Sequence, residues 1–188
     1  RWLNVTGVQT CALPILFLFL VDADRDELRG IMGVGPTSHE EAYRIWGELS
    51  RTALTFEQYL ENVNRGLVAR GGLQDLVESI VIDLGETKNL LTETVKTGTA
   101  SYIRDAWNEP LIDDTMRRIV ISDEFVIVPL IVKNQVIGLL LADNAFSGRP
   151  ITGDSIEVLT MFAAQAAIAI ENAKILGDLA EKVEELEE

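Results

Sequence analysis

Two residue types that are common in catalysis and in binding soft metals occur once each in this sequence. They are Cys11 and His39, the only cysteine and the only histidine among 188 residues. His39 precedes Glu40 and Glu41 at the expected start of a helix, which is typical of a surface histidine near a helix cap. A phosphoacceptor histidine would need its own helical hairpin and a domain that binds ATP, and the sequence contains neither. We therefore predict that this chain is not an enzyme.

Carboxylates are numerous, but their placement does not suggest general acid–base catalysis. Adjacent acids lie in expected loops and in the C-terminal tail, where water solvates them. These acids are Asp22 and Asp24, Asp113 and Asp114, and Glu184 and Glu185. Asp143 ends an apolar stretch, and its expected role is to form a turn with Asn144. The phosphate-binding patterns G-x-x-x-x-G-K-[S/T] and G-x-G-x-x-G are absent from the sequence.

The segment VTGVQTCALPI, Val5 to Ile15, contains the cysteine and leads into an apolar stretch that is too short to span a bilayer. Polar residues interrupt the segment before Pro14, so it does not resemble a secretory signal. It is the translation of a standard adapter of short-read DNA sequencing, and Arg1 to Asn4 fits the frame of the preceding bases. We therefore interpret residues 1–15 as adapter-derived and not native. The natural sequence is then N-terminally truncated and has no cysteine.

The composition indicates one acidic globular domain with a modest addition. A hydrophobic fraction of 47% is sufficient for a full core, and the net charge of −14 repels nucleic acid and anionic membranes. Without a natural cysteine we expect no disulfide and no cysteine-held metal. We also expect a cytoplasmic location, with no nucleic-acid partner and no direct membrane contact by this segment.

Continuous apolar stretches predict a sheet whose central strands are covered on both faces. Leu16–Val21 and Leu28–Gly35, joined by the polar residues 22–27, predict one hairpin. A second hairpin is expected in EFVIVPLIVKNQVIGLLLADN, where Asn134 tolerates positive φ. Pro129 cannot donate to a ladder, so its missing N–H should point away from a partner or mark a bulge. Shorter strands are expected at Ile80–Leu84 and Ala100–Arg104.

Helical patterns alternate with these strands. Ser38 and Glu41 resemble a capping box that opens one helix, and Asn89–Lys96 predicts another that ends at Gly98. The first of these helices has an apolar stripe, and a further helical pattern follows it: Ala42, Ile45, Trp46 and Leu49, then Phe56–Val63. The sequence ARGGLQDL is expected to be a loop because of Gly71 and Gly72, and AWNEPLIDDTMRR a loop with about one helical turn.

The last helix is expected to begin after Thr152, which can cap it. Apolar residues lie nearly all round it from Ala163 to Ile170, so we expect burial on more than one side there. Beyond this part, a three-four-three spacing predicts a coiled-coil seam, and the alternative is the end of a single amphipathic helix. The seam consists of Asn172, a candidate polar register residue, followed by Leu176, Leu179, Val183 and Leu186.

These motifs resemble those of a known family. FVIVPLIVKNQVIGLLLADN followed by ITGDSIEVLTMFAAQAAIAIENAKI resembles the end of a GAF domain, and FLFLVDADRDELRGIMGVGP resembles the start of one. The resemblance covers Phe17 to Ala173. The segment ADN-x-F-x-G-x-P-I and the long insert after GVGP resemble the GAF domains of bacterial sensor histidine kinases. The family implies an α+β fold: a central antiparallel sheet with helices on both faces, here with the C-terminal helix extending as a coiled coil.

The resemblance also implies a dimer interface at the first and last helices and a pocket for a small molecule on the other face. Covalent bilin binding and methionine-sulfoxide reduction in this fold need cysteines, and haem needs an axial ligand that His39 is badly placed to supply. The signature of the cyclic-nucleotide-binding members is absent. We therefore expect an unidentified ligand, with no covalent bilin, haem or metal.

The candidate ligand site is the segment SYIRDAW, residues 101–107. Arg104 could meet an anionic group, Asp105 a donor, and Trp107 could offer a flat apolar face. Met32 and Phe125 could face the same cavity, although the parity of an all-apolar strand is ambiguous. The alternative is a strand end with solvated charges and a tryptophan that serves packing.

We interpret residues 16–171 as a GAF domain and residues 172–188 as the start of a coiled-coil signalling linker. The expected function is to sense a small ligand in a bacterial signal-transduction protein, a sensor histidine kinase. The ligand-bound or ligand-free state of the domain would be transmitted through a dimeric C-terminal helix to an output domain in the same polypeptide. The alternative is a GAF-fold dimerisation or interaction module without a working pocket.

Overall fold

The computed structural model describes residues 15–42, 72–146 and 148–187. Outside these ranges lie residues 1–14 of the proposed adapter segment, the expected helix Phe56–Val63, and Ile45, Trp46 and Leu49 of the preceding stripe. Ile15, the last residue of the proposed adapter segment, is the first residue of a strand and is buried.

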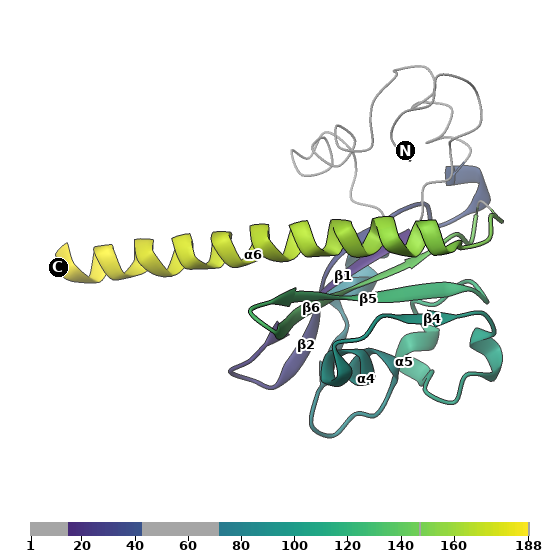
Figure 1. The fold of residues 1–188 in the computed structure, drawn as a ribbon, viewed down its shortest axis with the longest axis horizontal. Coiled ribbons are helices and arrows are strands. Elements are labelled where there is room, and N and C mark those ends of the chain that lie inside the picture. The colour runs from purple at the N-terminus through teal and green to yellow at the C-terminus, as the bar shows by residue number, and fades with distance from the viewer. Residues whose placement is uncertain (1–14, 43–71, 147, 188) are drawn as a thin grey trace, which may run out of the picture.

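The core of the fold is a six-stranded sheet in which every neighbouring pair is antiparallel. The strand order is β3-β2-β1-β6-β5-β4 (Figure 1). The strands are β1 (Ile15–Asp22), β2 (Glu27–Val34), β3 (Val81–Asp83), β4 (Ser101–Ile103), β5 (Phe125–Val132) and β6 (Gln135–Asp143). The helices are α3 (Gly72–Glu78), α4 (Leu90–Thr97), the short 3-10 helix η1 (Ala106–Asn108), α5 (Asp114–Arg117) and α6 (Gly153–Glu187).

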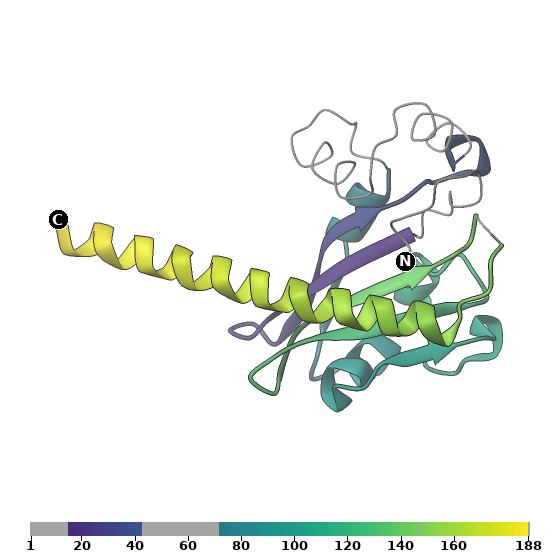
Figure 2. The same ribbon diagram turned by 45° about the horizontal axis from the view of Figure 1, so that its top comes forward.

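Helices cover both faces of this sheet (Figures 1 and 2). One face packs against α3, α4 and α5 through the larger apolar core, which includes Phe17, Phe19, Phe125 and Leu141. The other face packs against α6 through a smaller core that includes Val128, Leu130, Ala163 and Ala167. The expected α+β fold is therefore confirmed, and its central strands are apolar at most positions because both of their faces are buried.

The β5–β6 hairpin has the two-residue turn that its sequence predicts. Lys133 and Asn134 have φ angles of 50° and 64°, and Val132 pairs with Gln135 on either side of them. Two consecutive positive φ values are the signature of the turn that matches the twist of a hairpin. Pro129 pairs with Leu139 of β6, whereas the pairing with β4 ends at Ile127. Pro129 therefore lies where β5 has no neighbour on its β4 side.

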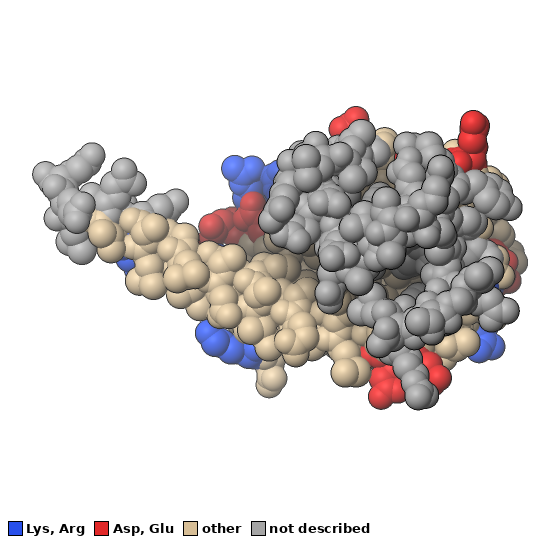
Figure 3. Space-filling view, turned by 90° about the horizontal axis from the view of Figure 1, so that it is seen from above, with Lys and Arg blue, Asp and Glu red and all other residues tan. Residues whose placement is uncertain are grey.

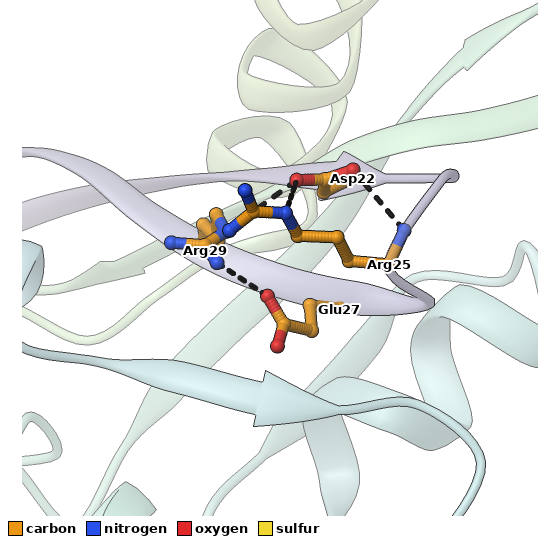
Figure 4. A network of polar contacts seen from close by, with 4 residues as sticks. All are labelled: Asp22, Arg25, Glu27 and Arg29. Atoms are coloured by element: carbon orange, nitrogen blue, oxygen red, sulfur yellow. Dashed lines mark hydrogen bonds and ion pairs between the residues drawn. The ribbon is translucent and has the colours of Figure 1, made fainter.

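Charged residues surround the β1–β2 turn (Figure 4). Arg29 lies 2.5 Å from Glu27 and 3.6 Å from Asp22, and the N–H of Arg25 donates to Asp22 at 3.3 Å. Because these side chains are partly exposed, each pair contributes little to stability. These contacts place the two arginines beside the acids at the two ends of the turn, so they reduce repulsion between carboxylates there.

Helix α3 occupies part of the segment ARGGLQDL, for which a loop is the wrong prediction. Its side chains Leu73 and Val77 are buried against β2. The side-chain amide of Gln74 also pairs with backbone groups of β2, accepting from Gly33 N at 3.1 Å and donating to Ile31 O at 2.9 Å. Tertiary packing on β2 therefore stabilises a short helix that begins with glycine and has weak local signals.

Two glycines of β2 make this packing possible. A Cβ atom on Gly30 would lie 1.9 Å from the carbonyl oxygen of Val77, and one on Gly33 would lie 2.5 Å from that of Leu73. The backbone of α3 thus passes over β2 at a distance that only glycine permits. Gly30 N also donates to Ile80 O at 3.0 Å, which connects the strand to the chain just beyond the helix.

A buried asparagine links the N-termini of α4 and α5. Asn89 Oδ1 accepts from Thr92 N, and the Thr92 hydroxyl accepts in turn from Asn89 N, so α4 begins with a capping box. Asn89 Nδ2 donates at 3.0 Å to Asp113, the residue that caps α5 by accepting from Met116 N. One side chain therefore links the starts of two of the three helices that cover this face of the sheet.

We expect Asn89→Ala to lower the free energy of unfolding by about 2 kcal/mol, because it removes a helix cap and leaves the N–H of Thr92 without its acceptor. Urea unfolding followed by circular dichroism measures this loss. Asn108→Ala is the matched control, since Asn108 is exposed and its amide bonds only to Asp105 nearby. The control should stay within about 0.5 kcal/mol of the wild type. Equal losses in the two variants would contradict the linking role.

Helix α6 begins at the expected cap and then runs well past the sheet (Figure 2). Thr152 Oγ1 accepts from Ser155 N at 3.2 Å, and Ser155 Oγ accepts from Thr152 N at 3.3 Å. Within this chain the helix is buried on one side only, at Ala163 and Ala167, so the expected burial on more than one side is not found in a single copy. The reason is that the sheet lies against one side of α6 only.

Candidate functional site

Arg104 lies on the α6 side of the sheet and is exposed. Its guanidinium sits 5.1 Å from the centre of the Tyr102 ring, and Tyr102 packs against the α6 core. The neighbouring Ile103 packs against the opposite core, as strand alternation requires. Arg104 therefore points away from the face that α3, α4 and α5 cover, where the family resemblance implies a pocket.

The other four predicted ligand-site residues do not gather with Arg104. Asp105 is exposed and accepts from the amide of Asn108, and Trp107 in η1 is 56% exposed. Phe125 is fully buried in the larger core, below α4 and α5. Met32 pairs with Leu18 across β1–β2, so the two share a face, and Leu18 packs on the α6 core. The structure thus places Met32 and Phe125 on opposite faces of the sheet.

The residues of the expected coiled-coil seam are exposed along α6. Asn172, Leu176, Leu179 and Val183 all present their side chains to solvent, Leu176 with 67% of its surface. The side chain of Leu186 is outside the described part of the structure. Figure 3 shows the outer side of α6 as a band with few charged residues, which continues from the body of the domain onto the projecting part of the helix.

Exposed apolar residues also occupy positions of the expected seam closer to the start of α6. Val158 and Phe162 stand fourteen residues, or two heptads, before Asn172 and Leu176, and both are exposed. Beside this seam lies a third exposed column, consisting of Met161, Ile168 and Ile175. The seam column that starts at Val158 continues with the polar Gln165 and Asn172, so alongside the sheet the apolar columns are that of Phe162 and Ala169 and the third column. From Leu176 onward both seam columns are apolar, and Lys182 continues the third.

Asp143 is buried, with 1% of its surface exposed, at the end of β6. Its backbone pairs with Ile15 of β1 and Phe125 of β5, and both of these side chains belong to the larger core. Asp143 Oδ1 accepts from Ala145 N at 3.0 Å, which is the turn-forming role that the sequence indicates. Oδ2 has no hydrogen-bond partner of good geometry within the described ranges.

Burial raises the pKa of Asp143 from 3.8 to about 6, because the apolar surroundings disfavour the ionised carboxylate. The backbone N–H groups of Ala145 and Ile121 oppose this shift and are too weak to cancel it. Among the described residues, the contacts of this carboxyl include no cation that would favour its ionised form. The sequence predicts the turn at Asp143 but not the burial of its side chain. The one sequence feature that indicates this burial is the position of the acid directly after a continuous apolar strand.

His39 is exposed in the first turn of a helix, as expected. Ser38 Oγ accepts from Glu41 N at 3.1 Å, and the carboxylate of Glu41 accepts from Thr37, so this helix start is capped. The rings of His39 and Phe146 make a T-shaped contact, with 5.0 Å between the ring centres. Among the described residues, no three His, Cys, Asp or Glu side chains are grouped so as to hold a metal ion.

Comparison with known families gives one match, the GAF domain, whose family model matches residues 3–170. The matched range includes most of the segment interpreted above as adapter. No curated protein matches the chain in a sequence comparison.

Several solved structures resemble this one. The crystal structure of residues 122 to 287 of a methyl-accepting chemotaxis protein is 20% identical, with a TM-score of 0.55 and coverage of 86% of this chain and 80% of that chain. The second GAF domain of DevS from Mycobacterium smegmatis is 16% identical, with a TM-score of 0.53 and coverage of 88% and 85%. A type II free methionine-R-sulfoxide reductase from Thermoplasma acidophilum is 11% identical, with a TM-score of 0.51 and coverage of 84% and 79%. At these identities the likeness establishes the fold alone.

Proposed function

Because the chain belongs to the GAF domain family, we propose that it is a sensory and regulatory domain of a bacterial signal-transduction protein. A small molecule bound on the α3, α4 and α5 face would favour one of two arrangements of a paired α6. The paired helix would pass this difference to an output domain in the same polypeptide. The resemblance of ADN-x-F-x-G-x-P-I to sensor histidine kinases supports such a kinase as the parent protein, with this domain in the cytoplasm.

The observation that carries this proposal is the exposed apolar surface of α6, which no described part of the chain covers. Its large apolar residues recur with the heptad spacing at both ends of the range from Val158 to Val183, and Gln165, Ala169 and Asn172 occupy the seam positions between them. A second copy of the chain offers the same face, and a two-fold axis parallel to α6 would bring the two seams together. The partner that we propose is therefore a second copy of this chain.

The width of the apolar surface supports the same partner. Met161, Ile168 and Ile175 extend the apolar surface beyond the seam, which suits a helix that packs on a second neighbour, whereas the two seam columns alone suit a two-stranded coiled coil. Alongside the sheet, the second neighbour would be the family's first helix, which precedes β1. Beyond Leu176 each α6 would contact only the α6 of the second copy.

Membrane insertion is a second explanation for the apolar character of α6, and the fold disfavours it. Residues Gly153–Ala180 are long and apolar enough to cross a membrane by length and composition. However, Ala163 and Ala167 are buried against the sheet, and a membrane-spanning helix would have to give up these contacts. We therefore attribute the apolar outer surface to a helical partner.

A dimerisation or interaction module without a working pocket is the second candidate function. Two observations favour it: Arg104 points away from the expected pocket, and large side chains such as Phe17, Phe19 and Met116 fill the described core on that face. Both candidate functions need the paired α6. We propose no catalytic activity for either one, since Cys11, the only cysteine, lies in the segment interpreted as adapter.

Sedimentation of the full chain tests the paired helix. We expect the wild type to be a dimer at micromolar concentration and Leu176→Glu to weaken the dimer by roughly a hundredfold. The reason is that a charge at this seam position must either be buried or face its own copy.

Lys174→Glu is the matched control for this experiment. Lys174 also lies on the exposed part of α6 but outside the seam, and its substitution changes the net charge by more than Leu176→Glu does. The control should remain a dimer. A monomeric wild type, or a Leu176→Glu variant as dimeric as the control, would contradict the proposed function.

A further inference from the structure

Asp143 is the one charged side chain that is buried within the described residues. Its cross-strand neighbours Ile15 and Phe125 are apolar, so the row of side chains in which it stands contains no cation. One carboxylate oxygen bonds to Ala145 N, and the other has no hydrogen bond of good geometry in the described part of the chain, although the N–H of Ile121 lies near the carboxyl. A buried ionised group without a counter-charge destabilises the folded protein, so a buried aspartate at this position is expected to have a role that offsets this cost.

The turn after β6 does not supply that reason. Asparagine could accept the same hydrogen bond from Ala145 N through its side-chain carbonyl, and it would carry no charge into the core. Asp83, at the end of β3, makes equivalent turn contacts to Gly85 N and Glu86 N while it remains exposed. The turn therefore explains one oxygen of Asp143 and leaves both its charge and its second oxygen unexplained.

The carboxyl is buried, and two large apolar residues are its neighbours, Ile121 in space and Phe146 in the chain. The N–H of Ile121 lies near it, and the Ile121 side chain is 46% exposed. Phe146 comes directly after Ala145, is partly buried against the larger core, and makes a T-shaped contact with the His39 ring. A single strong acceptor beside apolar side chains is the arrangement that suits a ligand with one polar head and an apolar body.

We propose that Asp143 is the recognition group for a small organic cation that carries N–H donors on an apolar body. The cationic head would donate to Oδ2 and supply the missing counter-charge, and the body would lie against Ile121 and Phe146. This inference rests on the proposed sensory function and names the class of its ligand. It also moves the candidate site from residues 101–107 to the end of β6.

Three probes of one size test the proposal: benzylammonium, neutral benzyl alcohol and anionic benzoate. They are titrated into the isotope-labelled full chain near neutral pH and followed by nuclear magnetic resonance. We expect benzylammonium to bind at least about tenfold more tightly than the other two and to shift the carboxyl carbon resonance of Asp143. In Asp143→Asn this preference should fall to within roughly twofold, while Asp83→Asn should retain it.

The wild-type carboxyl resonance makes the test independent of whether Asp143→Asn folds. The proposal is overturned if the three probes bind equally, if benzylammonium leaves that resonance unmoved, or if Asp143→Asn keeps the preference. In each of these cases an ordered water is a sufficient partner for Oδ2. Sedimentation of the same samples distinguishes this inference from the proposed function. A dimer that does not bind the cation overturns only this inference, whereas a monomer overturns the proposed function.

Discussion

Gly30→Ala should destabilise the domain by about 3 kcal/mol or more, a large share of the stability of a domain of this size. The added Cβ would lie 1.9 Å from the carbonyl oxygen of Val77 and 2.7 Å from its carbonyl carbon. Both atoms belong to the backbone of α3, so no side-chain rotation can relieve the overlap. The helix must move off β2, and its buried contacts through Leu73 and Val77 are then lost. Urea unfolding at equilibrium measures the change.

Gly72→Ala is the control for this experiment, because the nearest atom to its added Cβ is Thr37 Cγ2 at 3.7 Å, an ordinary contact. The control should be neutral or more stable than the wild type by up to about 1 kcal/mol, since alanine favours a helix more than glycine does. If Gly30→Ala stayed within about 1 kcal/mol of this control, α3 could not lie on β2 as described.

The second large effect is a pH dependence that comes from Asp143. Because the folded-state pKa of this group is about 6 and its ordinary value is 3.8, the folded protein binds the proton more tightly than the unfolded protein. Its contribution to stability is therefore greatest at low pH and is lost as the pH rises through about 6. Between about pH 5 and pH 7.5 we expect this group alone to remove roughly 1–2 kcal/mol.

Asp143→Asn should remove that part of the pH dependence, since asparagine does not titrate. The difference in unfolding free energy between wild type and variant, measured in urea at both pH values, should shift in favour of the variant at the higher pH. Asp83→Asn removes one carboxylate with similar turn contacts at an exposed position and should leave the slope unchanged. Equal slopes for wild type and Asp143→Asn would show that the buried carboxyl does not titrate in this range.

The sheet could be predicted from the sequence in most of its detail. Strands such as Phe125–Val132 are uninterrupted apolar segments, and such segments need cover on both faces wherever they lie in a domain. The Lys133-Asn134 turn and the cap at Asn89 are local signals, because each depends on the backbone preferences of two to four consecutive residues. These elements therefore appear in the structure close to where their patterns place them.

The candidate ligand site could not be predicted in the same way. An apolar strand has no polar alternation, so the sequence does not reveal that Met32 faces α6 while Phe125 faces the opposite core. Helix α3 depends on how closely it approaches Gly30 and Gly33, which are about 40 or more residues away in the chain. The burial of Asp143 likewise depends on Ile15 and Phe125 from two other strands. All three features are set by tertiary contacts.

The length of α6 has a consequence for the angle at which any following domain is presented. The helix contacts the β5–β6 turn through Glu171 and Lys133, 3.5 Å apart, and then projects beyond the sheet as far as Glu187. Each residue added to this projecting part would rotate the next domain by about 100° and advance it by about 1.5 Å. Only insertions of seven residues would restore both the seam and that angle. The projecting helix thus sets the orientation of the domain that follows it. When this domain is fused to a new output domain, the length of the connecting helix should be changed by multiples of seven residues.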